Sequence, residues 1–276
     1  MFNEATLAGM ASETVNGVTL AYEERGQGMP VVLLHGYPLD SRMWANELHS
    51  LDARHRVIAP DLRGFGKSPS IVPFTIEQLA DDVRALLAKR GALPCVLGGF
   101  SMGGYVALAF AKKYPTDLRA LVLVDTRAEA DTTEGKAARD KAMEVVRRAG
   151  PKAIADQMLP KLLVPDDQRR GPKVTEMVRG MIESQPPLTI EHALRAMRDR
   201  EDYTSMLPSI AVPTLILVGE KDPLTPPPMS RAMHERIPRS QLVVIPDAAH
   251  LAPLENPDEV GRAIQEFLRS LELNVA

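Results

Sequence analysis

Six short stretches of this sequence are almost entirely apolar, and this feature restricts the possible folds more than any other. Strands that are buried on both faces have this pattern, because neither side of the strand meets water. Amphipathic segments with helical spacing lie between or after them, at 75–91, 101–115 and 258–273. Strands that alternate with helices predict an α/β fold with a mostly parallel sheet and helices on both faces. The six expected strands are 31–34, 56–60, 95–99, 121–124, 214–219 and 242–246.

Two regions depart from this alternation. Residues 14–26 alternate apolar and polar side chains around Asn16-Gly17, which predicts a β-hairpin. Later in the chain, a long region contains only amphipathic helical patterns separated by prolines. The organisation predicted from these patterns is a mobile N-terminus at 1–13, an α/β core at 14–125 and 212–276, and a helical lid insertion at 126–211.

The expected insertion is rich in methionine, which leaves two interpretations open. Flexible methionine side chains can line an adaptable apolar pocket. They can equally pack the insertion onto the rest of the protein. The methionines concerned are Met143, Met158, Met177, Met181, Met197 and Met206.

Charge and hydropathy restrict the possible partners and the compartment. The 276-residue chain carries a formal net charge of −3 and has no long basic run, so we expect no nucleic-acid partner. The N-terminus has no secretory signal pattern, and no apolar run approaches the roughly 18 residues of a membrane span. The single cysteine, Cys95, excludes an internal disulfide and is expected in the core. We therefore expect a cytoplasmic protein with no membrane partner.

Residues 99–103, Gly-Phe-Ser-Met-Gly, join an expected strand to an expected helix. A G-x-S-x-G pattern in this context places a serine on a sharp turn at the carboxyl end of the sheet, where it can act as a nucleophile. Glycines permit the close approach of strand and helix. We therefore predict that Ser101 is a catalytic nucleophile.

A serine nucleophile requires a base, and the sequence contains six histidines. His35 and His250 are the two that follow expected strands directly. His250 also follows the serine in the chain, as the order Ser…Asp…His requires, so we predict that it is the base. His35 is expected to brace its loop, and His49 and His55 are expected at the surface.

Five motifs together resemble the α/β-hydrolase superfamily. Within it, the chain is similar to bacterial esterases and 3-oxoadipate enol-lactonase-like hydrolases. Epoxide hydrolases and haloalkane dehalogenases of this superfamily carry an aspartate where this chain has Ser101, which argues against both activities. The motifs are HGYP at 35–38, DLRGFGKS at 61–68, GFSMGG at 99–104, GEKD at 219–222 and DAAHLAPLENP at 247–257.

The resemblance implies the remaining parts of the site. The backbone N–H groups of Tyr37 and Met102 are expected to form an oxyanion hole. Four aspartates compete for the third position of the triad: Asp61, Asp125, Asp222 and Asp247. Asp125 follows the strand after the nucleophile and is a serious rival. Asp222 has the position that is usual in the family, so we predict a triad of Ser101, His250 and Asp222.

The expected function is a serine hydrolase that cleaves carboxylic esters or lactones through an acyl-enzyme. The same triad also serves C–C bond hydrolases, acyltransferases and perhydrolases, and some proteins of this fold act as ligand receptors. We expect a small-molecule substrate, while the oligomeric state is not indicated. No residues have metal-ligand spacing and no loop has a phosphate-binding pattern, so neither a metal nor a cofactor is expected.

Overall fold

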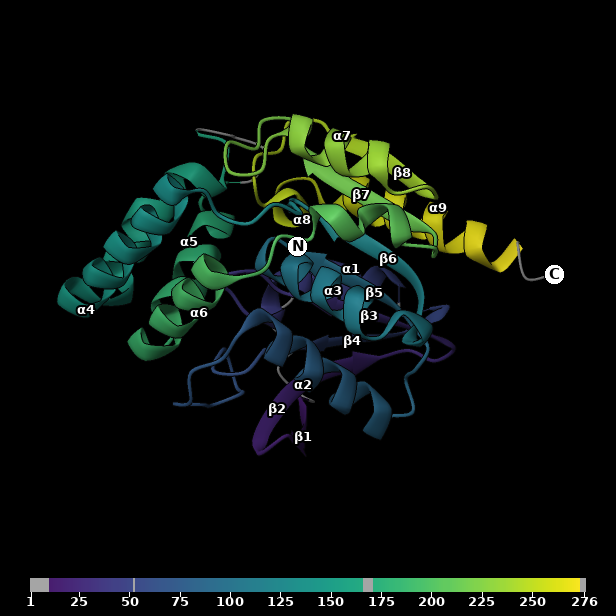
Figure 1. Ribbon diagram of the computed structural model, residues 1–276, viewed down its shortest axis with the longest axis horizontal. Helices are drawn as coiled ribbons and strands as arrows, with labels where there is room; N and C mark the ends of the chain where they lie inside the picture. The colour runs from purple at the N-terminus through teal and green to yellow at the C-terminus, as the bar shows by residue number, and fades with distance from the viewer. Residues whose placement is uncertain (1–9, 52, 166–170, 274–276) are drawn as a thin grey trace.

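The computed structural model describes residues 10–51, 53–165 and 171–273, and it contains the sheet with helices on both faces that the sequence predicts (Figure 1). These residues form one sheet of eight strands in the order β1-β2-β4-β3-β5-β6-β7-β8. The pairs β1–β2 and β2–β4 are antiparallel, and every other neighbouring pair is parallel. The strands are β1 (Ala11–Val15), β2 (Val18–Arg25), β3 (Met29–Leu34), β4 (His55–Pro60), β5 (Cys95–Phe100), β6 (Leu118–Val124), β7 (Thr214–Gly219) and β8 (Ser240–Ile245).

Helices cover both faces of this sheet (Figure 1). Helices α2 and α3 contact each other on one face, and α1 and α9 contact each other on the other face. Strands β3 and β5 to β7 are almost entirely buried, as their apolar sequences require. The helices are α1 (Ala45–Leu51), α2 (Ile76–Lys89), α3 (Met102–Lys113), α4 (Thr133–Leu162), α5 (Gly171–Glu183), α6 (Pro187–Asp199), α7 (Pro227–Arg236), α8 (Ala252–Glu255) and α9 (Pro257–Leu273).

Local sequence signals explain two of the element boundaries. The turn between β1 and β2 has positive φ at both Asn16 (47°) and Gly17 (77°), which suits a tight hairpin. Helix α2 begins with a capping box, in which Gln78 N donates to Thr75 Oγ1 at 3.2 Å and Thr75 N donates to Gln78 Oε1 at 2.9 Å. Both features follow from the sequence.

Helices α4 to α6 occupy the chain between β6 and β7 and lie together on one side in Figure 1. Helix α4 is interrupted at Gly150, where φ is 74° and ψ is −175°. Of the six methionines of this region, three are buried in the hydrophobic core and the other three pack against it, which favours the packing interpretation.

The junction between α5 and α6 is attached to loops that follow β3 and β4. Gln185 Nε2 donates to Asp40 Oδ2 at 3.0 Å, and Gly66 N donates to Gln185 Oε1 at 3.0 Å. Thr189 Oγ1 donates to Gly64 O at 2.9 Å. These bonds fix the helical region against the loops of the sheet.

The structure also differs from some expectations. Strand β1 begins at Ala11, inside the range that was expected to be a mobile N-terminus, while residues 1–9 lie outside the described part of the chain. Helices α1 and α7 were not predicted, because they are short and α1 continues from a single 3₁₀ turn at Ser41–Trp44. His49 is exposed as expected, but the prediction for His55 was wrong, because it starts β4 and is buried beside Glu272. Cys95 is buried, as expected.

No helix in the described ranges is both long and apolar enough to cross a membrane.

One buried carboxyl group in α1 has no ion-pair partner among the described residues. Glu47 is fully buried, and neither of its carboxyl oxygens has a hydrogen-bond partner within the described residues. Burial raises the pKa of Glu47 from 4.5 to about 8, because the charged form loses its hydration. Glu47 therefore stays protonated in the folded protein at neutral pH.

We expect Glu47→Gln to stabilise the protein more as the pH rises. Below pH 4.5 the carboxyl is protonated in both states, whereas between 4.5 and about 8 it ionises only in the unfolded chain. In this range the free energy of unfolding of the wild type falls, relative to Glu47→Gln, by about 1.4 kcal/mol for each pH unit. Above about pH 8 the difference levels off at several kcal/mol. Urea unfolding of both proteins at several pH values measures this difference. A difference that is independent of pH contradicts the assignment.

Candidate active site

Ser101 lies at the turn between β5 and α3 in a backbone conformation that side chains rarely adopt. Its φ is 51° and its ψ is −112°. The turn is fixed from both sides, because Ser101 N donates to Val124 O at 2.9 Å and Thr126 Oγ1 donates to Ser101 O at 2.8 Å. The strain therefore persists because neighbouring groups on and beyond β6 determine the conformation.

The glycines around Ser101 are required by close backbone contacts. A Cβ atom on Gly99 would lie 2.2 Å from Gly103 O, and a Cβ atom on Gly103 would lie 2.5 Å from Leu34 O. Both neighbours are backbone atoms that cannot move independently. These contacts bring the start of α3 against the end of β3 and the loop that follows it.

His250 and Asp222 complete a hydrogen-bonded chain from Ser101. The His250 Nε2 atom lies 2.9 Å from Ser101 Oγ, and its Nδ1 atom lies 2.8 Å from Asp222 Oδ2. An ionised carboxylate can only accept, so Nδ1 carries the proton and donates to Asp222. Nε2 is then free of a proton and accepts the Ser101 hydroxyl hydrogen.

The surroundings of Asp222 favour its ionised form. Burial by itself would raise the pKa of Asp222, but the hydrogen bond and charge of His250 and donors from Thr225 outweigh burial and lower it. Thr225 Oγ1 donates to Oδ2 at 2.6 Å, and the Leu224 and Thr225 amides donate to Oδ1 at 2.8 and 3.1 Å. Asp222 can therefore hold the His250 ring in one tautomer and stabilise its protonated form.

Asp125 lies near this chain but has a different partner. Its Oδ1 atom accepts from Gly219 N at 2.7 Å, and its Oδ2 atom is buried without a partner in the described structure. Burial and the charge of Asp222 raise the pKa of Asp125 well above its ordinary value. Asp125 thus bonds the end of β7, three residues before Asp222, and this hydrogen bond does not go to His250.

The loop that contains Tyr37 is braced by a neutral histidine. Leu62 N donates to His35 Nε2 at 2.9 Å, so the ring proton must be on Nδ1, which donates to Gly36 O at 3.0 Å. Burial lowers the pKa of His35, which agrees with a neutral ring. His35 therefore has the bracing contacts expected of it.

The backbone amides of Tyr37 and Met102 are the two donors predicted for the oxyanion hole. Neither N–H donates to a protein acceptor within the described part of the chain. Met102 is the first residue of α3, where the helix dipole favours negative charge. Gly36 and Gly103 allow the two segments to approach each other closely. A Cβ atom on Gly36 would lie 2.5 Å from Phe100 Cδ1, and a Cβ atom on Gly103 would lie 2.7 Å from His35 O.

The other candidate aspartates have structural partners. Asp61 accepts from Ser41 N at 2.8 Å and from Lys67 N at 2.7 Å, which shapes its own loop. Asp247 pairs with Lys221 at 2.8 Å. Neither contacts the His250 ring through these bonds.

Sequence reasoning missed two residues that contact Asp222 or the loop of His250. Besides Thr225, which contacts Asp222, Glu255 holds the loop around His250: its Oε2 atom accepts from Ala249 N at 2.7 Å and from Leu251 N at 3.2 Å. Its Oε1 atom accepts from Val164 N at 2.8 Å. A threonine three residues after the acid and a glutamate five residues after the histidine are weak signals, because only the fold brings them to the site.

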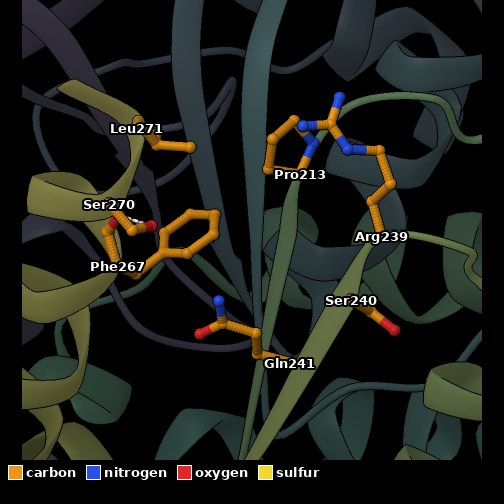
Figure 2. Close-up of a pocket in the computed structure, with 7 residues that line it drawn as sticks. All are labelled: Pro213, Arg239, Ser240, Gln241, Phe267, Ser270 and Leu271. Atoms are coloured by element: carbon orange, nitrogen blue, oxygen red, sulfur yellow. Dashed lines mark hydrogen bonds between the residues drawn. The ribbon is translucent and has the colours of Figure 1, made fainter. Parts of the chain in front are cut away.

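The described residues contain no group of three His, Cys, Asp or Glu side chains placed to hold a metal ion. A cavity of about 310 Å³ lies elsewhere, at the amino ends of β7 and β8 (Figure 2). Because Ser101, Asp222 and His250 follow the carboxyl ends of strands, this cavity lies at the opposite edge of the sheet. Its lining residues are Pro213, Arg239, Ser240, Gln241, Phe267, Ser270 and Leu271.

Comparison with known proteins agrees with this geometry. The family model for the alpha/beta hydrolase fold matches residues 29–257. The chain belongs to the α/β-hydrolase family. The AB hydrolase superfamily protein YisY of Bacillus subtilis is 31% identical over 271 residues, covering 94% of this chain and 98% of that protein.

Two solved structures place the chain within the family. A thermophilic esterase from Thermogutta terrifontis, solved with malate bound, is 46% identical with a TM-score of 0.89, covering 95% of this chain and 97% of that one. The enol-lactonase of Burkholderia xenovorans is 28% identical with a TM-score of 0.87, covering 94% and 100%. The resemblance to esterases and enol-lactonases is therefore confirmed.

Proposed function

We propose that this protein is a serine hydrolase that cleaves carboxylic esters or lactones through an acyl-enzyme intermediate. The observation that carries this proposal is the continuous chain of short contacts from Ser101 Oγ through the His250 ring to Asp222, with distances of 2.9 and 2.8 Å. Similarity to an esterase and to an enol-lactonase supports this substrate class.

In the proposed reaction, Ser101 Oγ attacks the substrate carbonyl while His250 Nε2 takes its proton. The carbonyl oxygen becomes an oxyanion that accepts hydrogen bonds from the Tyr37 and Met102 amides. Collapse of this intermediate expels the alcohol, which receives the proton from His250. Water then attacks the acyl-enzyme with His250 again as base, which releases the acid and restores Ser101.

Helices α4 to α6 are proposed to act as the lid of this site. The loop of His250 is tied to the end of α4, because Leu251 N donates to Leu162 O at 3.0 Å and Val164 N donates to Glu255. The end of α4 is therefore hydrogen-bonded to the loop that carries the proposed catalytic histidine. Substrate size and shape are set by this region, and the chemistry by the sheet.

Burst kinetics with a chromogenic acetate ester test the proposal. The expected result is a rapid release of one alcohol per active site, followed by a slower steady rate, and loss of both after treatment with a serine-directed phosphonate. A parallel panel of esters, lactones and thioesters identifies the preferred bond. Ligand binding without turnover of any of them contradicts the proposal and indicates a receptor.

A further inference from the structure

We propose that Glu255 is a positioning residue that makes the alignment of His250 depend on where the end of α4 lies. Through its carboxylate, the helical region between β6 and β7 is coupled to the proposed catalytic base. This inference rests on the proposed function, because it concerns the regulation of the same site.

Glu255 accepts hydrogen bonds from the backbone at the start of its own short helix. Helix α8 begins directly after Leu251, whose apolar side chain cannot cap it. One carboxyl oxygen of Glu255, Oε2, accepts from Leu251 N at 3.2 Å and from Ala249 N at 2.7 Å. These two amides belong to the residues on either side of His250. A single atom of Glu255 therefore holds the backbone before and after the proposed base.

The other carboxyl oxygen of Glu255 reaches the helical region. Its Oε1 atom accepts from Val164 N at 2.8 Å, just beyond the end of α4. Leu251 N also donates to the carbonyl of Leu162, the last residue of α4, at 3.0 Å. Glu255 is only 7% exposed, and bonds to a buried carboxylate are stronger than those between neutral groups. The carboxylate therefore joins two segments that lie 91 residues apart in the sequence.

The opposite side of the loop that carries His250 lies against the end of β7. A Cβ atom on Gly219 would lie 1.9 Å from Ala249 O, so the two backbones are in direct contact. The segment after Gly219 carries Asp222, whose Oδ2 atom lies 2.8 Å from His250 Nδ1. The loop is thus held between the segment of the proposed acid and the end of α4. Loss of either contact shifts the His250 ring relative to its partners.

Helix α4 is built so that its last part can move separately from its first. The backbone leaves the helical conformation at Gly150, where φ is 74° and ψ is −175°, and a Cβ atom there would meet nothing within 4 Å. The part after this break ends at Leu162 and is attached to α5 by an ion pair between Asp156 and Arg179 at 2.6 Å. A substrate that contacts this part of the proposed lid therefore acts on the segment that Glu255 holds.

The first test removes the contact with α4 and leaves the triad unchanged. Val164→Pro deletes the N–H that Glu255 accepts, whereas Val164→Ala keeps it. Proline suits the preceding chain, because Leu163 has φ −122° and ψ 145°, the region favoured before a proline. We expect Val164→Pro to lower kcat for a nitrophenyl acetate by about 10- to 100-fold with little change in KM, because small displacements of a catalytic group are costly. Val164→Ala should stay within a few-fold of the wild type.

Glu255→Gln makes the complementary change. An amide has one oxygen and its NH₂ group cannot accept, so glutamine loses either the Val164 bond or the bonds beside His250. We expect a similar loss of kcat. The double variant with Val164→Pro should lose no more than the larger single loss, because both changes cut the same connection. Glu266→Gln is the matched control, since Glu266 is 56% exposed on α9 and lies 3.5 Å from Arg262.

Titration of the active sites with a chromogenic phosphonate, run to completion, separates positioning from a merely structural role. A variant that only unfolds more easily has fewer titrated sites and an unchanged kcat per site. The proposal predicts a lower kcat per titrated site in Val164→Pro and Glu255→Gln. An unchanged kcat per site overturns it, and so do single losses that multiply in the double variant.

If Val164→Pro does not fold, the comparison of Glu255→Gln with Glu266→Gln decides by the same measure. Failure of the proposed function is distinct, because the wild type would then neither hydrolyse the ester nor react with the phosphonate.

Discussion

We expect Ser101→Ala to lower kcat for an activated ester by about 10⁴–10⁶-fold, as single replacements in the triads of other serine hydrolases do. The reason is structural, because the Ser101 hydroxyl lies 2.9 Å from His250 Nε2 and alanine removes it. Alanine is compatible with the fold, because it keeps the backbone bond from Ser101 N to Val124 O. Steady-state hydrolysis of a nitrophenyl acetate measures the loss.

The matched control is Ser50→Ala, an exposed serine on α1 that contacts neither His250 nor Asp222. Its rate should equal that of the wild type, and circular dichroism should report the same fold for both variants. A folded Ser101→Ala protein with a tenth of the wild-type rate contradicts the assignment of Ser101 as the nucleophile.

We expect Asp222→Asn to lower kcat by about 10⁴-fold with the fold intact. The asparagine side chain can present its NH₂ group to His250 Nδ1, which favours the ring tautomer with the proton on Nε2. That tautomer cannot accept the proton of Ser101. The same ester assay measures the effect, and a urea titration establishes that the variant remains folded.

Asp125→Asn is the matched comparison, because it makes the same chemical change at the neighbouring strand end. Burial and the charge of Asp222 raise the pKa of Asp125 and so disfavour its charged form, and an asparagine carbonyl can accept from Gly219 N as Asp125 Oδ1 does at 2.7 Å. We therefore expect a rate within a few-fold of wild type. If Asp125→Asn is inactive and Asp222→Asn is active, the third member of the triad is Asp125 and the assignment of Asp222 is wrong.

The core of the fold follows from local sequence patterns. The run Cys95–Phe100 forms β5, and the run Thr214–Gly219 forms β7, because an entirely apolar segment of this length is stable only when buried on both faces. The glycines beside Ser101 could also be interpreted from the sequence alone. The structure supplies the reason for Gly103, because a side chain there would collide with Leu34 O. These features depend on a few adjacent residues.

The remaining features depend on contacts between distant parts of the chain. Asp131 and Arg200 are 69 residues apart, and their ion pair arises only when α4 and α6 pack together. His55 is polar but is buried, because the fold places it beside α9. Glu255 contacts the His250 loop and the end of α4 simultaneously, which no local pattern indicates.

Mass spectrometry of the reacting enzyme tests the acyl-enzyme mechanism most directly. The wild type is mixed with a nitrophenyl ester, quenched in acid during the burst, and digested. The mechanism predicts one acyl group on the peptide that contains Ser101, which disappears as the substrate is exhausted, and no acyl group on this peptide in Ser101→Ala. An enzyme that turns over the ester at full rate while this peptide stays unmodified would contradict covalent catalysis by Ser101.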